Sequence, residues 1–203
     1  MKLYDGGRAP NPRRVTVFLA EKGIEVEKVP VDMGQLGHKS EEVTRLNPLQ
    51  RLPVLVLDDG TALSESVAIC RYFEELHPEP PLMGTDARDK AIVEMWNRRM
   101  ELIFLAAVAN AFRHTHPAMQ EWEKPQLAEW GEINRPKALA FLELLDKELA
   151  QREFIAGDRY TIADITGMIG FEFMKPARIE RPEHLANVMR WYQAVSSRPS
   201  AKA

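Results

Sequence analysis

Two neighbouring residues, Glu65 and Ser66, offer a carboxylate and a hydroxyl at a point where the sequence predicts the start of a helix. Apolar residues follow them at close to the helical period, with Ile69 and Phe73 on one face. A carboxylate near a helix N-terminus is favoured by about 0.3–1 kcal/mol, so the pair could serve only to start the helix. The alternative is that the acid and the hydroxyl hold a ligand. These residues alone leave both interpretations open.

Pro53 opens the apolar run PVLVL at residues 53–57, where a strand would otherwise need an N–H group. Proline is tolerated at the first residue of a strand. The alternative is a cis Leu52–Pro53 peptide bond, which costs only about 0.5–1 kcal/mol and usually has a purpose. A cis bond would turn the backbone N–H and C=O of Leu52 outward, where an extended peptide could pair with them. The sequence leaves both forms open.

Other reactive residue types carry less signal. Cys70 is the only cysteine, which excludes an internal disulfide and a Cys-x-x-Cys redox pair. On an apolar helix face it is interpreted as a small hydrophobic core residue. His114 and His116 are two residues apart and do not face each other on a helix, so we expect no metal site. Tyr4 lies in a predicted strand, as a residue of the core or of the sheet surface.

The composition narrows the class of protein. The chain has 203 residues, of which 45% are hydrophobic and 28% charged, as expected of a packed globular fold. Its net charge of −3 gives no electrostatic basis for binding nucleic acid or an anionic membrane. No apolar run approaches the roughly 20 residues that span a bilayer, and no apolar signal segment follows the first residues. We therefore expect a cytoplasmic protein with neither nucleic-acid nor membrane partners.

The chain changes character at the Pro-rich segment HPEPPLMGTDARD, residues 77–89. Before this segment, short apolar runs alternate with helical patterns, and after it nearly everything is helical. The change predicts a first domain over residues 1–77, a semi-rigid linker over 78–85 and a second domain over 86–203.

The first domain is predicted to alternate strands and helices. Its expected elements are strands at 1–5 and 26–33, helices at 11–23 and 39–47, and a hairpin at 52–65. Asn11 is expected to be the N-cap of the first helix and Gly23 to end it. The hairpin is expected to turn at Asp59–Gly60. Four short strands with helices between them indicate a small mixed sheet, and hence an α/β domain.

The second domain is predicted to be all-helical. A long helix is expected over 85–117 and another over 134–149. The apolar stripe of the first consists of Ile92, Met95, Trp96, Met100, Ile103 and Ala107. Thr161 and Asp164 form a capping-box pattern ahead of an apolar run, which we interpret as a folding signal with no catalytic role.

Four segments of the chain, taken in order, resemble bacterial members of the cytosolic glutathione transferase superfamily. They are RAPNPRRVTVFLAEKGI (8–24), GHKSEEVTRLNPLQRLPVL (37–55), DDGTALSESVAICRYF (58–73) and FIAGDRYTIADI (154–165). The most specific part is NPxxxLPVL followed by ESxAI, and the glutathione-site motifs are theta-like. The resemblance covers essentially the whole chain. It implies an α/β plus all-α fold, with a thioredoxin-like N-terminal domain followed by an all-helical C-terminal domain.

The resemblance also implies that the first domain binds glutathione as a co-substrate, without a metal. Glu65 would pair with the ammonium group of the γ-glutamyl end, and Ser66, with the N–H groups of the helix start, would bind the neighbouring carboxylate. Leu52, ahead of Pro53, would bind the backbone of the cysteinyl unit. Cations or donors are needed for the glycine carboxylate, and the alternative for them is ordinary exposed surface. The candidates are His38, Lys39 and Arg51.

A second substrate and a partner subunit are implied as well. In the superfamily the second substrate lies between the first loop and the opening helices of the second domain. The residues at these places are Arg8, Ala9, Phe104 and Phe112. Members of the superfamily form homodimers, and the stripe near 92–107 is more apolar than one small bundle needs. We therefore expect a homodimer that acts on an electrophile or a disulfide.

The reaction requires glutathione as a thiolate, because the anion is the nucleophile. The serine that many classes place in the first loop is replaced here by Ala9. Asn11 is the remaining candidate for the activating group, since its amide can donate to sulfur beside a helix N-terminus. The alternative is that Asn11 is only an N-cap. The segment APNPRRV resembles the Nu class, whose members show disulfide-bond reductase activity without a catalytic cysteine, although Ala9 replaces their threonine.

Two functions therefore stay open. The first is an enzyme that uses the glutathione thiolate on a small electrophile or disulfide, as a transferase or a disulfide-bond reductase. The second is a glutathione-binding protein without catalysis, a ligand carrier or a regulatory interaction protein, which Ala9 in the place of serine favours. Turnover of an aryl halide or of a small disulfide distinguishes the two.

Overall fold

The computed structural model describes all residues from Met1 to Ala203 and divides the chain into two compact units. The first unit consists of Met1–Leu82 and Pro199–Ala203, and the second consists of Met83–Arg198. The division falls inside the segment that the sequence predicts as a linker. The last five residues belong to the first unit, because the Ser200 hydroxyl donates to Glu21 and the Arg13 guanidinium donates to the Ala201 carbonyl at 2.8 Å.

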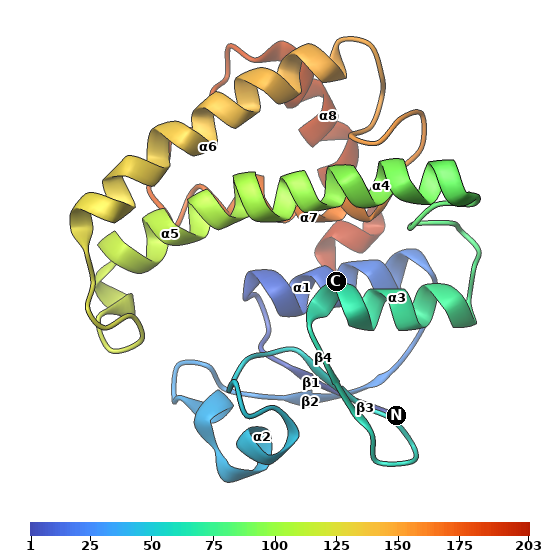
Figure 1. Ribbon diagram of the computed structural model, residues 1–203, viewed down its shortest axis with the longest axis vertical. Helices are drawn as coiled ribbons and strands as arrows, with labels where there is room; N and C mark the ends of the chain where they lie inside the picture. Colours follow the sequence, from blue (N-terminus) through green and yellow to red (C-terminus); the bar gives the residue numbers. More distant parts are fainter. The chain divides into compact units, whose positions relative to one another are not determined.

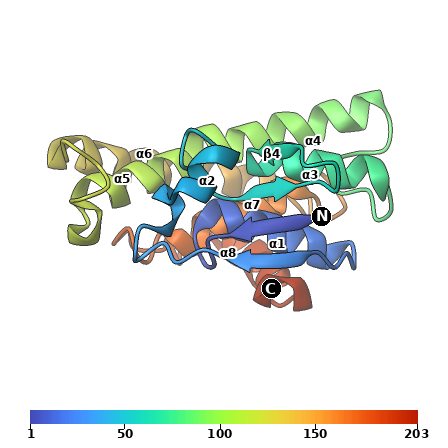
Figure 2. The same ribbon diagram turned by 90° about the horizontal axis from the view of Figure 1, so that it is seen from below.

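A four-stranded mixed sheet forms the base of the first unit (Figures 1 and 2). Its strands are β1 (Lys2–Asp5), β2 (Glu27–Pro30), β3 (Val54–Val56) and β4 (Ala62–Ser64), in the order β2-β1-β3-β4. Strands β1 and β2 are parallel, whereas β3 is antiparallel to both β1 and β4. Gly60 turns the hairpin with a φ of 88°. The predicted order of strands and helices is confirmed.

Three α-helices complete this unit. They are α1 (Pro10–Glu21), α2 (Glu41–Leu46) and α3 (Ser66–Leu76). Helices α1 and α3 lie side by side on one face of the sheet (Figure 1). Their apolar faces bury large side chains against the sheet, such as Phe18 of α1 and Phe73 of α3, together with Leu3 and Leu55 of the strands. This packing brings the starts of two helices to the same part of the fold.

The start of α1 differs from the prediction. Ala9 is the N-cap, with an extended backbone at φ −61° and ψ 143°, and Asn11 is an exposed residue of the first turn. The N-cap prediction for Asn11 is therefore wrong, because Pro10 already has the fixed φ that suits the first helical position. The predicted end is confirmed. Gly23 has a φ of 64°, and the amides of Gly23 and Ile24 bond back into the last turn, as in a Schellman motif.

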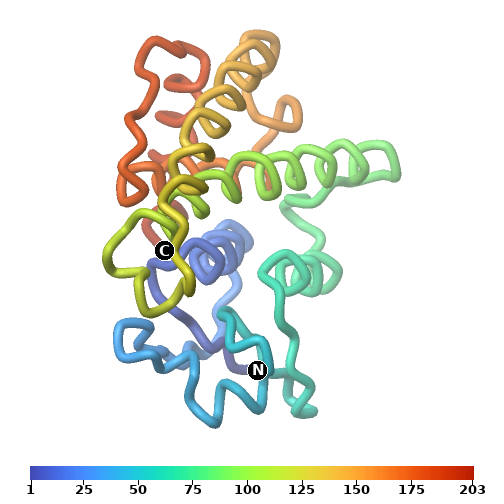
Figure 3. The backbone as a smooth tube through the Cα atoms, turned by 60° about the vertical axis from the view of Figure 1, so that its left-hand side comes forward, coloured from blue at the N-terminus to red at the C-terminus, as the bar shows by residue number.

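The second unit is all-helical. Its α-helices are α4 (Ala87–Arg99), α5 (Ala106–Thr115), α6 (Ala128–Leu149), α7 (Ile162–Phe173) and α8 (Ala186–Ser196). A π-helical segment, Met100–Leu105, joins α4 to α5 without a break, and Figure 3 shows the resulting long rod. Helix α7 is buried along nearly its whole length and forms the centre of this unit. No helix is both long and apolar enough to cross a membrane.

The π-helical segment changes which side chains face the core. Phe104 is completely buried, whereas Ile103 is 50% exposed, Leu102 60% and Met95 40%. The predicted apolar stripe is therefore divided: Trp96, Met100 and Ala107 are buried, whereas Met95 and Ile103 are exposed. A π turn contains more residues than an α turn, so the side chains that follow it are rotated around the helix axis. The rotation places Phe104 in the core and Ile103 on the surface.

The capping box at the start of α7 is confirmed. The backbone N–H of Thr161 donates to the Asp164 carboxylate at 2.9 Å, and the Thr161 hydroxyl lies 3.1 Å from the same oxygen. The other carboxylate oxygen accepts hydrogen bonds from the Ile155 amide at 2.9 Å and from the Trp191 indole at 2.8 Å. Asp164 therefore ties the start of α7 to a preceding loop and to α8.

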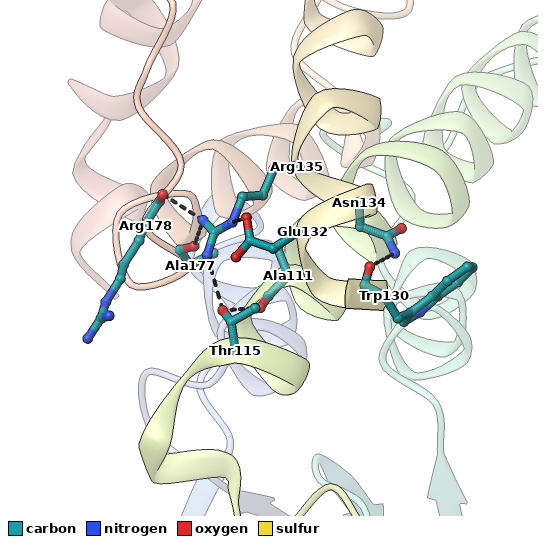
Figure 4. Close-up of polar contacts among 8 residues, drawn as sticks. All are labelled: Ala111, Thr115, Trp130, Glu132, Asn134, Arg135, Ala177 and Arg178. Carbon is teal, nitrogen blue, oxygen red and sulfur yellow. Dashed lines mark hydrogen bonds and ion pairs between the residues drawn. The ribbon is translucent and has the colours of Figure 1, made fainter. Parts of the chain in front are cut away.

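Arg135 of α6 connects three segments of the second unit (Figure 4). Its guanidinium donates to the carbonyls of Ala177 and Arg178 at 2.5 and 2.6 Å, and to the Thr115 hydroxyl at 3.1 Å. Its Nε lies 2.9 Å from a carboxylate oxygen of Glu132. The planar fork of arginine suits several simultaneous hydrogen bonds, so Arg135 holds α5 and the chain after α7 against α6.

Candidate functional site

The N-terminus of α3 presents Glu65 and Ser66 in different ways. Glu65 occupies the N-cap position, but its side chain makes no capping hydrogen bond and is exposed. Its backbone has a φ of 69° and a ψ of 112°, a sparsely populated conformation for a non-glycine residue. Residues held in such conformations cost about 1–3 kcal/mol and cluster at functional sites. The helix does start at this pair, but Glu65 is not a side-chain cap, and its exposed carboxylate stays available to a ligand.

Ser66 is the first residue of α3 and is only 5% exposed. A guanidinium nitrogen of Arg14, Nη1, lies 3.2 Å from its hydroxyl oxygen. Arg14 itself is completely buried. An arginine is not expected to be buried, but Arg14 lies one helical turn before Phe18 on the apolar face of α1. The spacing of four residues between Arg14 and Phe18 therefore indicates that the Arg14 side chain faces the core.

Helices α1 and α3 run in the same direction, with their N-termini at the same end. Arg14 and Ser66 meet near the two starts, and Lys22 and Glu74 meet near the two ends, where the Lys22 ammonium lies 2.8 Å from the Glu74 carboxylate. The N-terminus of each helix carries a partial positive charge and N–H groups that the helix itself does not use. This end of the unit is therefore suited to bind an anion.

The loop before β3 presents Leu52. The Leu52–Pro53 peptide bond is cis, so of the two forms that the sequence leaves open the structure has the cis form. The Leu52 side chain is buried in a cluster with Tyr4 and Val54, whereas Leu52 itself lies before the first paired residue of β3. Its backbone is thus held in place by a buried side chain, outside the ladder of the sheet.

Asn47 organises the loop that leads to Leu52. Its side-chain amide donates to the Arg51 carbonyl at 2.9 Å and its side-chain oxygen accepts from the Leu49 amide at 3.1 Å. Its backbone carbonyl accepts from the Gln50 amide at 2.8 Å. Asn47 is 4% exposed. The sequence indicates only a helix end and a family motif at Asn47, because its hydrogen-bond partners depend on the shape of the loop.

His38, Lys39 and Arg51 form a group of basic side chains. His38 is completely buried in a short 3-10 turn, whereas Lys39 and Arg51 are exposed. Burial lowers the pKa of His38, and the positive charges of Lys39 and Arg51 lower it further, so the three side chains lie within electrostatic range. The neutral imidazole is favoured. The charge available to an anion here comes from Lys39 and Arg51.

Gly6 brings the first loop close to Leu52. A Cβ atom at Gly6 would lie 3.2 Å from Leu52 and Pro12 side-chain atoms and 3.3 Å from Met33. The absence of a side chain thus lets the loop after β1, the start of α1 and the residue before Pro53 pack together. Asn11, next to Pro12, is consequently close to the Leu52 side of this unit.

Two other candidates for sulfur chemistry are occupied or buried. The Tyr4 hydroxyl donates to Glu42 at 2.6 Å, and this bond raises the pKa of Tyr4. Burial raises the pKa of the Cys70 thiol to about 12, so the thiolate is disfavoured at neutral pH. The prediction that Cys70 is a core residue is confirmed, and of the two places that the sequence leaves open for Tyr4 the structure has the core.

The four residues predicted for a second-substrate pocket have different environments. Arg8 is exposed and Ala9 half-buried in the first unit. In the second unit, Phe104 is completely buried, and its ring is stacked with that of Phe141 at a centroid distance of 6.1 Å. Phe104 is a core residue, so the prediction that it lines a pocket is wrong. Phe112 is half-buried, with its ring 4.7 Å from that of His116.

Comparison with protein families matches both parts of the chain. Residues 9–76 match the model described as "Glutathione S-transferase, N-terminal domain", and residues 95–199 match "Glutathione S-transferase, C-terminal domain". Glutathione S-transferase 2 of Saccharomyces cerevisiae is 36% identical over 205 residues, which cover 100% of this chain and 88% of the yeast protein.

Solved structures agree with these matches. A glutathione S-transferase domain-containing protein from Marinobacter aquaeolei has a TM-score of 0.92 and 37% identity, over 98% of this chain and 99% of that one. A glutathione S-transferase of class Gtt2 from Vibrio parahaemolyticus has a TM-score of 0.88 and 37% identity, over 100% and 96% of the two chains. The resemblance to the Nu class rests on the first loop and stays a prediction. The chain belongs to the glutathione S-transferase family, whose members use glutathione as a co-substrate.

Proposed function

We propose that the first unit binds glutathione with the γ-glutamyl end at the start of α3. The observation that supports this most directly is the pair of neighbouring residues with opposite environments. The Glu65 carboxylate is exposed and suits the ammonium group of glutathione. Ser66 is buried at the positive end of an eleven-residue helix and suits the neighbouring carboxylate.

The rest of the tripeptide would follow the surface between three loops. The backbone of Leu52, next to the cis bond, would pair with the cysteinyl unit as an added strand. Lys39 and Arg51 would neutralise the glycine carboxylate, whereas the completely buried His38 would support the turn that carries Lys39 rather than contact the ligand. Ionic strength should weaken the contribution of the two exposed cations more than that of the buried serine.

Glu65→Ala and Ser66→Ala should each weaken glutathione binding by about tenfold or more. Each variant loses a charge-assisted hydrogen bond to the ligand, which is worth about 1.5–3 kcal/mol. Calorimetric titration of each variant with glutathione measures the effect. Glu75→Ala is the matched control, because Glu75 is an exposed acid near the other end of the same helix. Unchanged affinity in both variants, with the fold intact, would contradict the site.

We propose that the bound thiolate acts on a small electrophile or on a disulfide. In the second reaction the thiolate attacks one sulfur of the disulfide, a new S–S bond forms, and the other sulfur leaves as a thiolate that takes a proton. A second glutathione then attacks the resulting mixed disulfide, releases its remaining half as a thiol and leaves oxidised glutathione. The first loop supports a weakly activated thiol, because Ala9 carries no donor and Asn11 offers only an amide beside a helix N-terminus.

A weakly activated thiol should favour disulfide exchange over conjugation. Exchange is fastest for thiols with a pKa near the ambient pH, whereas conjugation depends on the fraction of thiolate. Asn11→Ala should lower kcat/KM for reduction of a small mixed disulfide with little change in glutathione affinity. The measurement is kcat/KM for the disulfide and for an aryl halide, beside calorimetric affinity. If both rates survive the substitution, Asn11 is not the sulfur donor.

The second candidate function is glutathione binding without catalysis, as a ligand carrier or regulatory interaction protein. Ala9 in the place of the usual serine favours it. Glutathione affinity without turnover of either the aryl halide or the disulfide would select this function. We also propose a cytoplasmic location, which suits a chain with one buried, reduced cysteine.

We propose that the protein forms a homodimer through the outer face of α4 and the π-helical segment, where Met95, Leu102 and Ile103 are exposed. Ile103→Glu should shift the sedimentation mass from dimer to monomer at micromolar concentration. Leu144→Glu is the control, because Leu144 is 48% exposed on a different helix. A monomeric mass for the wild type would contradict the proposal.

A further inference from the structure

Two parallel rows of side chains face each other between α1 and α3. The α1 row and the α3 row each have members four residues apart, which places them on one face of their helix. The rows are Arg14, Phe18 and Lys22, and Ser66, Cys70 and Glu74. The first and last positions are joined by polar contacts, at 3.2 Å and 2.8 Å, and the middle of the seam is apolar. The two helices are thereby held in register along their length.

The hydrogen bond between Arg14 and Ser66 can run in only one direction, from the guanidinium to the hydroxyl oxygen. A guanidinium has five N–H donors and no acceptor, so the Ser66 oxygen must accept this hydrogen bond. The hydroxyl of Ser66 has one proton of its own, which must then point away from Arg14. Because Arg14 is completely buried and Ser66 is 5% exposed, water contributes little to this arrangement.

We propose that Arg14 is a positioning residue that makes Ser66 a hydrogen-bond donor to the ligand. This inference rests on the proposed glutathione site. With Arg14 present, one lone pair of the Ser66 oxygen is used and the Ser66 proton is directed away from the guanidinium. The ligand group at the start of α3 then meets mainly donors, the Ser66 hydroxyl and the N–H groups of the first turn, beside a buried positive charge. A carboxylate, which only accepts, fits this set. A carboxamide at the same position would place its own N–H groups against donors.

Arg14 therefore determines specificity for an α-carboxylate at the γ-glutamyl end of the ligand. Without Arg14 the Ser66 proton can turn elsewhere, both lone pairs of its oxygen can accept from an amide, and the buried positive charge that favours an anion is lost. A binding site rejects a ligand when binding leaves a buried polar group without a hydrogen-bond partner. A site whose hydroxyl can rotate to supply the partner does not reject it. The preference for carboxylate over carboxamide should thus depend on Arg14, beyond any general effect of Arg14 on stability.

The test measures the affinities of two ligands by calorimetry. One is glutathione, and the other is its analogue with the γ-glutamyl α-carboxylate replaced by a carboxamide. The wild type should prefer glutathione by about tenfold or more, and Arg14→Met should reduce that ratio by about tenfold. Arg14→Lys, which keeps a buried cationic donor, should retain most of the ratio. Arg13→Met is the matched control, because Arg13 is the adjacent arginine of α1 and donates to the Ala201 carbonyl, so the ratio should not change.

The ratio separates positioning from a purely structural role. If Arg14 only supports the fold, Arg14→Met will weaken both ligands equally and leave the ratio unchanged, which would overturn the inference. Arg14→Gln provides a second test if the methionine variant fails to fold. Its side-chain oxygen can accept the Ser66 proton, so the preference for carboxylate should fall, and an unchanged ratio would again overturn the inference. Failure of the wild type to bind glutathione at all would instead overturn the proposed function.

Discussion

Lys22→Met should lower the free energy of unfolding by about 3–5 kcal/mol, the cost of breaking a buried ion pair by removing one partner. The Lys22 ammonium lies 2.8 Å from the Glu74 carboxylate, and the two side chains are 0% and 6% exposed. The same ammonium donates to the carbonyls of His77 and Pro80 at 2.6 and 2.7 Å. Methionine fills a similar volume, but it removes the ion pair with the Glu74 carboxylate and the hydrogen bonds to the two backbone carbonyls.

Urea denaturation of the variant and the wild type measures this loss. Lys28→Met is the control, because Lys28 is exposed in β2 and its loss should change stability by no more than about 0.5 kcal/mol. The double variant Lys22→Met, Glu74→Leu removes both charges and should recover part of the stability, since a buried pair replaced by apolar residues is often neutral. If Lys22→Met costs no more than the control, the buried pair does not hold α1 to α3.

Asp164→Asn should destabilise the protein at every pH, and more at low pH than at neutral pH. The carboxylate accepts hydrogen bonds from Ile155, Trp191 and Thr161, and an asparagine would turn N–H groups toward some of these donors. Burial raises the pKa of Asp164 to about 6, although the hydrogen bonds oppose this shift. In the unfolded chain an aspartate has a pKa of about 3.9.

The sign of the pH dependence follows from this difference. Between about pH 4 and pH 6 the folded state binds more protons at Asp164 than the unfolded state does. Its contribution to stability is therefore complete below about pH 4 and is lost as the pH rises through about 6. Asparagine does not titrate, so the gap between wild type and variant should shrink by about 2–3 kcal/mol from pH 4 to pH 7.5.

Denaturation curves of both proteins at several pH values between 4 and 7.5 measure this gap. Asp158→Asn is the control, because Asp158 is exposed in the same loop region and should produce a small gap at all pH values. A gap that stays constant, or that widens as the pH rises, would show that hydrogen bonding rather than burial controls the protonation of Asp164.

The sequence by itself predicted the features that depend on neighbouring residues. Gly23 ends α1 because only a few adjacent amides and carbonyls are involved, and the Thr161–Asp164 box forms within four residues. The order of strands and helices followed from the same local patterns, together with the turn at Gly60. Glu65 and Ser66 were found as a pair for the same reason, since the apolar period after them marks the helix start.

The tertiary structure decided the features that depend on residues far apart in the chain. Arg14 and Ser66 are 52 residues apart, and only the packing of α1 on α3 brings the guanidinium to the hydroxyl. The burial of His38 and the cis form of Leu52–Pro53 were likewise left open by the local sequence pattern. Local signals specify where an element begins and ends, because their partners lie within a helical turn. Burial and the direction of a hydroxyl proton depend on what the completed fold places beside each residue, and therefore only the packed structure determines them.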